Sequence, residues 1–265
     1  LQKNIWMDSA SFFKPDVKNY RLNRPSALIA GETGDLGLAV LWIVQTALIR
    51  PVINDLVLAA PDDSSLISLV SSIDNFSICA LAHSEDRNSP VTATEEDGSI
   101  ILNGVKKFIT AGVNADYILI TCRDKNESKI NRAVLLNREL IDPEEMKDLH
   151  LPVMKSVNHT SLHFKNKKVD LGYAPFVDAA SLRRAVKKWS IIEQALIIEA
   201  FIPFLSYFNR IAITRGLNIA DEKNIKNLAE NQSVLAGKQL EEAFYTGKIS
   251  EENINMKELF EIISQ

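Results

Sequence analysis

The stretch GSIILNGVKKFITAGVNADYILITCR, residues 98–123, decides the fold that the sequence predicts. Short runs rich in β-branched residues follow one another in this stretch, which is typical of strands. Asn103-Gly104 separates two of these runs. It is the strongest hairpin signal in the chain, because a type I′ turn requires a positive φ at both central residues. The stretch therefore predicts neighbouring strands with a hairpin at Asn103-Gly104.

Runs of this kind occur from about residue 77 to residue 172, within this stretch and on both sides of it. They are Ser77–Ala82, Val91–Thr94, Ile100–Leu102, Val105–Thr110, Tyr117–Cys122, Ala133–Leu136, Ser161–Phe164 and Lys168–Asp170. Closely spaced strands without intervening helices predict an antiparallel barrel or sandwich and not βαβ units. Glu95, Glu96 and Asp97 precede Gly98, and we expect a solvated turn there.

The segments on either side are helical in character. A helix is predicted from about 36 to 54, with Gly31 and Gly34 as its entry and Pro51 inside its last turn. A second is predicted to begin at Asp62 or Asp63. The polar segment 14–26 before them, punctuated by prolines, is predicted to be a loop or arm.

Beyond residue 180 the helical period returns. A long helix is predicted over 181–214 with a kink at Pro203, a further helix over 222–245, and a short last helix that begins at a capping box at Asn255. The sequence therefore predicts an α+β fold in three parts: an N-terminal helical segment, 1–76, a central antiparallel β-domain, 77–172, and a C-terminal helical bundle, 173–265.

Composition excludes several classes of function. The formal net charge of -4 argues against broad nucleic-acid binding, which needs a concentrated positive field. The apolar stretch LGLAVLWIVQTALI stops at Arg50-Pro51 and is shorter than the about 20 residues of a membrane span. No signal peptide is visible, and we expect a cytoplasmic protein without a membrane span.

The chain has few residues that could bind a metal or form a disulfide. Cys79 and Cys122 lie in apolar runs that read as buried strands, so we expect inert packing residues. His150, His159 and His163 lack a cysteine pair at zinc-ligand spacing, so no metal site is predicted.

The residues by themselves do not define a reaction. The chain contains no GxxxxGK[ST] and no GxSxG motif, and the glycines at 31–37 lack the strand and spacing of a dinucleotide fingerprint. Glu85 and Asp86 directly follow a buried strand, where functional residues are often found. No partner for them is identifiable from the sequence.

Residues 78–123 resemble the middle domain of the acyl-CoA dehydrogenase family. The family's hairpin reads Tyr-x-Leu-Asn-Gly-x-Lys-x-Phe/Trp-Ile-Thr-Asn-Gly and is followed by an Ala-Asp strand that ends in Arg. The positions in register are Leu102-Asn103-Gly104, Lys106, Phe108-Ile109-Thr110, Gly112, Ala115-Asp116 and Arg123. Weaker similarity in the same order covers 154–170, Tyr207 to Arg210 and Leu228-Ala229-Glu230. The resemblance implies the family's fold over most of the chain from residue 34 onward.

The resemblance also implies an FAD cofactor. In the family's hairpin an aromatic ring lies over the flavin and a threonine hydroxyl lies at its N5 edge, and Phe108 and Thr110 occupy those positions here. An aromatic face shields the isoalloxazine from water, and a hydroxyl near N5 can stabilise the reduced form. The positions implied to bind FAD are Ala82, His83, Ser84, Phe108, Ile109, Thr110, Arg210 and Arg215, and those implied to bind substrate are Ser89 and Arg184.

The chain departs from the family at three places. Ala82-His83-Ser84 stands where the family has Thr-Glu-Pro, and Arg87-Asn88-Ser89 stands where it has Gly-Ser-Asp. The family's catalytic glutamate comes from a loop that this sequence does not reach or from the head of a C-terminal helix. Leu182, Arg183 and Arg184 occupy that helix head here, and Glu193 and Glu199 lie deeper. The catalytic base is therefore unknown.

Three functions follow as alternatives. The resemblance implies α,β-dehydrogenation of an acyl-CoA or acyl-carrier thioester, as in fatty acid metabolism, by a homo-oligomer that completes its FAD site across subunits. A second possibility is a catalytically degenerate subunit that pairs with a full-length homologue. A third is a non-redox enzyme on the same fold, with His83, Glu85 and Asp86 as acid or base. Phe108 to Thr110 would merely finish a strand if the fold has lost its cofactor.

Overall fold

The computed structural model describes residues 25–216 apart from 75, 87, 152–153 and 174–178, together with positions 227 and 231. The described residues fall into two compact units. One comprises Leu48–Lys187, and the other comprises the residues up to Ala47 and those from Lys188 onward. The sequence-based boundaries at 76 and 172 remain predictions. Each unit is described by itself below.

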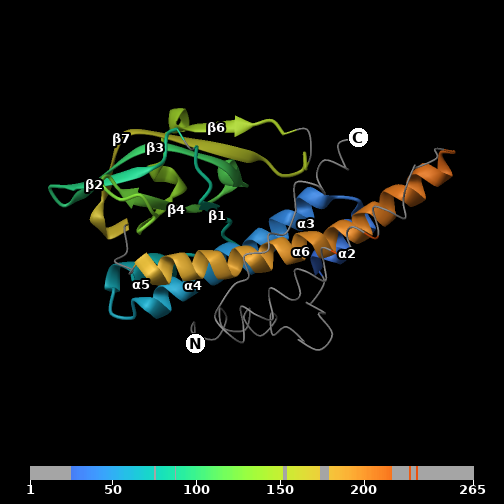
Figure 1. Cartoon of the computed structure of the whole chain (residues 1–265), viewed down its shortest axis with the longest axis horizontal. Coiled ribbons are helices and arrows are strands. Elements are labelled where there is room, and N and C mark those ends of the chain that lie inside the picture. Colours follow the sequence, from blue (N-terminus) through green and yellow to red (C-terminus); the bar gives the residue numbers. More distant parts are fainter. Residues whose placement is uncertain are drawn as a thin grey trace. The chain divides into compact units, whose positions relative to one another are not determined.

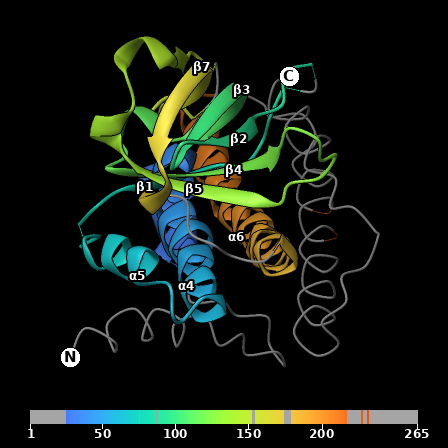
Figure 2. The same ribbon diagram turned by 90° about the vertical axis from the view of Figure 1, so that its left-hand side faces the viewer.

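The unit 48–187 is built around a mixed β-sheet (Figure 1). Its strands are β1 (Cys79–Ala82), β2 (Thr92–Glu96), β3 (Ser99–Thr110), β4 (Tyr117–Asp124), β5 (Arg132–Asn137), β6 (Met146–Leu149) and β7 (His159–Asp170). Their order is β1-β4-β2-β3-β7-β6, and β5 pairs with β4. Figure 2 shows the strands as a curled sheet. The α+β class is confirmed at this level.

The sheet is not purely antiparallel, and the prediction was wrong on this point. β1 and β2 both pair with β4 in parallel. Parallel neighbours need a crossover connection, which is usually a helix. Here the β2–β3 hairpin lies between β1 and β4 in the chain and takes the place of that helix. The spacing of the runs therefore suggested antiparallel neighbours.

The hairpin predicted at Asn103-Gly104 is also wrong. β3 runs without interruption from Ser99 to Thr110, and the two-residue turn lies at Asp97-Gly98, with φ angles of 47° and 72°. This confirms the turn that was predicted there. Gly104, with φ of 121°, lies instead at a bulge in the pairing of β3 with β7. A Cβ atom on Gly104 would lie 2.3 Å from the carbonyl oxygen of Pro90. A glycine with a positive φ occurs at some bulges as well as at turns, which explains the false signal.

Most of the predicted strands are present with shifted ends. Two pairs of short runs merge into the 12-residue strands β3 and β7. β6 was missed, because Met146–Leu149 has no exposed–buried alternation, with Lys147 and Asp148 both exposed. β4 is buried at six consecutive positions, as expected of a strand covered on both faces.

Two helices belong to this unit, α4 (Arg50–Ala59) and α5 (Ser64–Ser71). Asp63 caps α5, since its side chain accepts a hydrogen bond from the backbone N–H of Leu66, so the predicted start is confirmed. The helix predicted to end at 54 continues through α3 (Leu36–Ile43) and a π-helical turn (Val44–Ile49) to Ala59. Pro51 lies in the first turn of α4, where proline is tolerated.

This continuation overturns the argument that the apolar stretch is too short to span a membrane. Leu36–Ala59 and Ala179–Thr214 are both long and apolar enough by length and composition. The most apolar part of the first is 61% buried inside the protein, which is also typical of a core helix. Length and composition therefore give only weak evidence for a membrane span.

The other unit contains α2 (Pro25–Thr33), α3 and most of α6 (Ala179–Thr214). The polar segment 14–26 was predicted to be irregular, but its last two residues begin α2. Gly34, with φ of 68°, separates α2 from α3, and the side chain of Asp35 caps α3, which confirms a helix entry at Gly34. The predicted helices after residue 216, and Leu228-Ala229-Glu230, lie outside the described residues apart from positions 227 and 231.

The core of the sheet is a cluster of buried apolar side chains from most of its strands. Cys79 and Cys122 are both buried thiols, and burial raises the pKa of Cys79 to about 11 and that of Cys122 to about 12. The prediction of buried, inert cysteines is confirmed.

Candidate functional site

The segment that follows β1 lies alongside the second half of β3. The backbone N–H of Asp86 donates to the carbonyl of Val105 over 3.3 Å, and that of Lys107 donates to the carbonyl of Ser84 over 3.0 Å. Between them, Glu85 forms an antiparallel bridge with Lys106. The fold therefore brings residues 84–86 next to residues 105–107, although they are about twenty positions apart in the sequence.

Phe108 is exposed because β3 has a second bulge at this point. Side chains alternate across a strand, and Ile100, Leu102 and Lys106 all face the interior, so strict alternation would also bury Phe108. The pairing with β7 instead shifts between Lys106 and Ile109, and Phe108 has a φ of 59°. Ile109 then lies in the core, and Phe108 is 60% exposed.

This conformation is unusual for a large aromatic residue. A positive φ costs free energy for a non-glycine residue, and such strain tends to occur at functional sites. Bulges next to functional sites often redirect a side chain. The bulge therefore exposes the apolar ring of Phe108 to water, whereas a regularly alternating strand would have buried it.

Lys106 lies beneath this segment and is fully buried. Its ammonium group donates to the carbonyl oxygen of His83 over 3.0 Å, to Glu85 Oε2 over 3.0 Å and to Thr121 Oγ1 over 3.5 Å. An ammonium has three donor hydrogens, so these acceptors satisfy it. Burial lowers the pKa of Lys106 to about 8, which is still above neutral pH, so the ammonium group stays protonated at pH 7.

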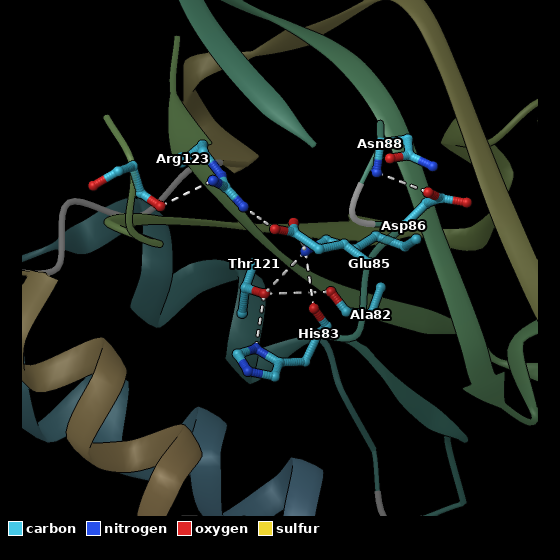
Figure 3. Close-up of polar contacts among 9 residues, drawn as sticks. Ala82, His83, Glu85, Asp86, Asn88, Thr121 and Arg123 are labelled. Carbon is cyan, nitrogen blue, oxygen red and sulfur yellow. Dashed lines mark hydrogen bonds and ion pairs between the residues drawn. The ribbon is translucent and has the colours of Figure 1, made fainter. Parts of the chain in front are cut away.

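Glu85 joins two cations. One carboxylate oxygen accepts from Lys106, and the other pairs with Nη2 of Arg123 on β4. Arg123 in turn donates from Nη1 to the carbonyl of Ser128 over 2.9 Å. Figure 3 shows the carboxylate of Glu85 directed toward Arg123. The result is a largely buried network that fixes the 83–86 segment to both β3 and β4.

His83 and Thr121 complete the network. Nδ1 of His83 lies 3.0 Å from Thr121 Oγ1, and the two side chains point toward each other in Figure 3. Burial and, to a smaller extent, the ammonium of Lys106 lower the pKa of His83 to about 4. The imidazole is therefore neutral at neutral pH.

Comparisons with known proteins agree with this architecture. No family model matches the chain, and no curated protein matches it in sequence. Among solved structures, an FAD-dependent dehydrogenase aligns with 82% of this chain and 60% of its own, at 19% identity and a TM-score of 0.56. The acyl-CoA dehydrogenase from Geobacillus kaustophilus aligns over 91% and 71% respectively, at 17% identity and a TM-score of 0.57. The chain has an acyl-CoA dehydrogenase-like fold.

This fold alone does not determine the chemistry. A nitrososynthase from Micromonospora carbonacea var. africana is similar to 88% of this chain and covers 63% of its own, at 12% identity and a TM-score of 0.60. The chain thus spans less than two thirds of the length of two of these three proteins. The acyl-CoA dehydrogenase-like fold is a frame whose activity depends on the residues of its site.

Within the acyl-CoA dehydrogenase-like fold, six of the predicted cofactor residues lie on two segments that are joined by the hydrogen bond from Lys107 to Ser84. Ala82 ends β1 and pairs with Ile120 of β4, His83 and Ser84 follow it, and Phe108, Ile109 and Thr110 end β3. Ile109 is fully buried in the core, so its side chain is not free to touch a ligand. Ser84 is exposed and Thr110 is partly buried. The roles of these residues remain predictions.

The other predicted residues lie elsewhere. Arg210 belongs to the unit of α2 and donates to the carbonyl of Gly31 over 3.0 Å, while Arg215, just after α6, is exposed. Arg184 is exposed on α6 and donates to Ser181 of the same helix over 2.8 Å. The carbonyl of Ser89 accepts from the backbone N–H of Val105. No contact among the described residues assigns these four a ligand.

Sequence reasoning missed Thr121 and the role of Lys106. Lys106 was noted only as a match to the family's hairpin. A signal for it existed, because the alternation from Ile100 and Leu102 places position 106 on the buried face, where a charge must be paired. Thr121 sits in an apolar run and carried no such signal. Glu193, considered as a base, lies in α6, and burial raises its pKa to about 7.

Proposed function

We propose that the chain binds FAD at the edge formed by residues 82–84 and 108–110. The observation that carries this proposal is Phe108, whose strained backbone holds a 60% exposed ring beside a segment fixed by a buried ion network. An isoalloxazine is a flat, largely apolar ring system, and such ligands are commonly held by aromatic side chains with a few placed polar groups. The comparison structures support the choice, since one of them is an FAD-dependent dehydrogenase.

The residues present fit this cofactor. Phe108 offers an aromatic face, Thr110 offers a hydroxyl two positions further along β3, and His83 offers a partly exposed imidazole. The strand-end position of all three agrees with the usual location of binding residues at the edges of a rigid scaffold. Arg210 and Arg215 belong to the other unit and stay predictions.

The reaction that we propose is the α,β-dehydrogenation of an acyl thioester, carried by CoA or by an acyl carrier protein. Bound FAD would accept the hydride from the β carbon, and a base would take the α proton. In this chain, Phe108 would exclude water from one face of the flavin. We assign the base to none of the described residues. The thioester and a homo-oligomeric or hetero-oligomeric assembly are part of the proposal.

A second candidate is a flavin- or thioester-binding subunit without turnover of its own. It is favoured by the ion pairs of the carboxylates closest to the site. Glu85 is paired with Lys106 and Arg123, and Asp86 is paired with Lys107. Carboxylates held in this way support structure and are poor proton acceptors. The same pairs make Glu85 and Asp86 poor choices as acid or base in a non-redox enzyme.

The test of the cofactor is a titration of the purified chain with FAD, followed by flavin fluorescence and absorbance. We expect binding, and we expect Phe108→Ala to weaken it by about fivefold, since an aromatic contact contributes of the order of 1 kcal/mol. Leu140→Ala is the control, because Leu140 is also an exposed apolar residue, at 37% exposure, and lies in the turn after β5.

Three outcomes separate the candidates. If the chain binds no FAD, the cofactor proposal is overturned. If it binds FAD and an acyl-CoA bleaches the flavin under anaerobic conditions, dehydrogenation is supported and the subunit without turnover is excluded. Binding without bleaching by short-, medium- or long-chain acyl-CoA supports the second candidate.

A further inference from the structure

The imidazole of His83 has one nitrogen engaged and one without a partner. Nδ1 lies 3.0 Å from Thr121 Oγ1. Nε2 makes no hydrogen bond within the part of the chain that the structure describes, and the residue is partly exposed. A buried or half-buried polar atom without a partner costs free energy unless a ligand or water satisfies it. His83 therefore has one polar atom to offer to a ligand.

The contacts of Thr121 indicate which nitrogen of His83 carries the proton. The threonine hydroxyl has one hydrogen, and it lies 3.5 Å from Lys106 Nζ and 3.5 Å from the carbonyl oxygen of Ala82. An ammonium can only donate, so the hydroxyl accepts from Lys106. A carbonyl can only accept, so the hydroxyl donates its one hydrogen to Ala82. It must then accept from His83 Nδ1.

This is the only arrangement in which all three contacts of the hydroxyl are hydrogen bonds. It places the imidazole proton on Nδ1 and leaves Nε2 as a bare acceptor. Burial and the ammonium of Lys106 lower the pKa of His83 to about 4, so that Nε2 also stays unprotonated at neutral pH. The network of Lys106 and Thr121 thus fixes both the charge and the tautomer of the imidazole.

The backbone of His83 lies beside the part of β3 that carries the exposed ring, since its carbonyl accepts from Lys106 Nζ over 3.0 Å. Asp86 is opposite Val105, Glu85 is opposite Lys106 and Ser84 is opposite Lys107. His83 precedes Ser84 and Phe108 follows Lys107, so the two residues adjoin a hydrogen-bonded pair, and the bulge at Phe108 ends this register. A ligand that covers the Phe108 ring and has an N–H group at its edge would meet both residues.

We propose that Nε2 of His83 accepts a hydrogen bond from an N–H group of the ligand that covers Phe108, and that His83 is a specificity-determining residue of this site. The inference rests on the proposed function. Two sources share this chemistry: the oxidised isoalloxazine ring, whose N3 atom carries its one N–H group, and the amide groups of the pantetheine arm of CoA. We expect the isoalloxazine, since Phe108 offers it a stacking surface.

The first test needs no ligand. In chain labelled with ¹⁵N-histidine, the resonances of His83 are assigned by their loss in His83→Gln. We expect the neutral imidazole with its proton on Nδ1 at pH 7. A proton on Nε2, or a doubly protonated ring at pH 7, would overturn the proposal whether or not the chain binds FAD.

The second test compares FAD with 3-methyl-FAD, in which the N3–H group is replaced by a methyl group. We expect the chain to bind FAD about tenfold more tightly, the value of about one hydrogen bond. His83→Leu, which cannot accept a hydrogen bond, should bind both flavins alike, and His83→Gln, which retains an acceptor oxygen, should keep part of the preference. His150→Leu is the control, because the side chain of His150 is 90% exposed.

A third titration, with coenzyme A, separates the two sources. If the chain prefers FAD over 3-methyl-FAD and loses this preference in His83→Leu, the N–H group belongs to the flavin. If both flavins bind alike and only the affinity for coenzyme A falls in His83→Leu, it belongs to the pantetheine arm. If neither affinity responds to His83→Leu, the inference is wrong. If no flavin binds at all, the proposed function fails, and the coenzyme A titration alone decides the role of His83.

Discussion

Two adjacent lysines of β3 meet two adjacent carboxylates, and the two ion pairs differ in their surroundings. Lys106 is fully buried against Glu85, whose side chain is 17% exposed. Lys107 is 38% exposed and pairs with Asp86, whose side chain is 27% exposed. Consecutive residues of a strand face opposite sides, so one pair lies in the interior and the other at the surface. Identical residue types in sequence can therefore contribute very differently to stability.

The largest expected effect is the loss of the buried ammonium. Lys106→Met should lower the free energy of unfolding by about 3–5 kcal/mol, because it leaves the carboxylate of Glu85 and the carbonyl of His83 without a donor in the interior. Urea unfolding followed by circular dichroism measures this change. Lys107→Met is the matched control, with at most about a tenth of the effect. Equal losses in the two variants would remove the distinction between the two pairs.

Removal of the negative charge of Glu85 also tests the buried ion pair. Glu85→Gln keeps the shape of the side chain but leaves Lys106 and Arg123 without a counter-charge. We expect a loss of about 2–3 kcal/mol in the free energy of unfolding, somewhat less than for Lys106→Met because the amide oxygen can still accept. Asp86→Asn is the control and should unfold at nearly the same urea concentration as the parent chain. A Glu85→Gln variant as stable as Asp86→Asn would contradict the buried network.

The contrast between the two lysines also shows how far the sequence can predict this molecule. The strands were predictable, because their apolar runs are rich in β-branched residues and separated by polar segments. The α+β class and the fold implied by the resemblance are supported by solved structures at TM-scores of 0.56 and 0.57. The buried position of Lys106 could have been read from the alternation that begins at Ile100.

The bulges of β3 were not predictable in the same way. Asn103-Gly104 signals a positive φ, but both a turn and a bulge satisfy that signal, and tertiary packing against Pro90 decides between them. Nothing in the local sequence favours a positive φ at Phe108, where a bulky side chain disfavours it. The exposure of this ring depends on pairing with β7, about fifty residues later in the chain. A neutral His83 likewise depends on contacts from two other strands.

The pH dependence of stability tests the buried network around Lys106 through His83. The pKa of His83 is lowered from an ordinary 6.5 to about 4, so below pH 6.5 the unfolded chain binds a proton that the folded chain does not. The contribution of His83 to stability is therefore present above pH 6.5 and lost as the pH falls toward 4. We expect a loss of about 2–3 kcal/mol in the free energy of unfolding over this range.

The comparison of the parent chain with His83→Gln isolates this contribution, since the other titrating groups are common to both. Urea unfolding at pH 7 and at pH 4.5 should show a steeper loss in the parent chain than in His83→Gln. Parallel losses in the two chains would show that His83 titrates normally and that Lys106 does not influence it.

The surface pair should give the smallest effect and respond to salt. The pKa of Asp86 is lowered, first by the hydrogen bond from the side chain of Lys107 and then by that from the backbone N–H of Asn88. Lys107→Gln should therefore raise the pKa of Asp86 toward its usual value, as measured by a ¹³C carboxyl titration, while the urea midpoint changes little. At 1 M salt the Debye length falls to about 3 Å, so the Coulombic part of the pKa difference should shrink. The difference in free energy of unfolding between the parent chain and Glu85→Gln should change little with salt, because a buried pair is screened much less than an exposed one. A large change with salt would show that the network around Lys106 is open to solvent.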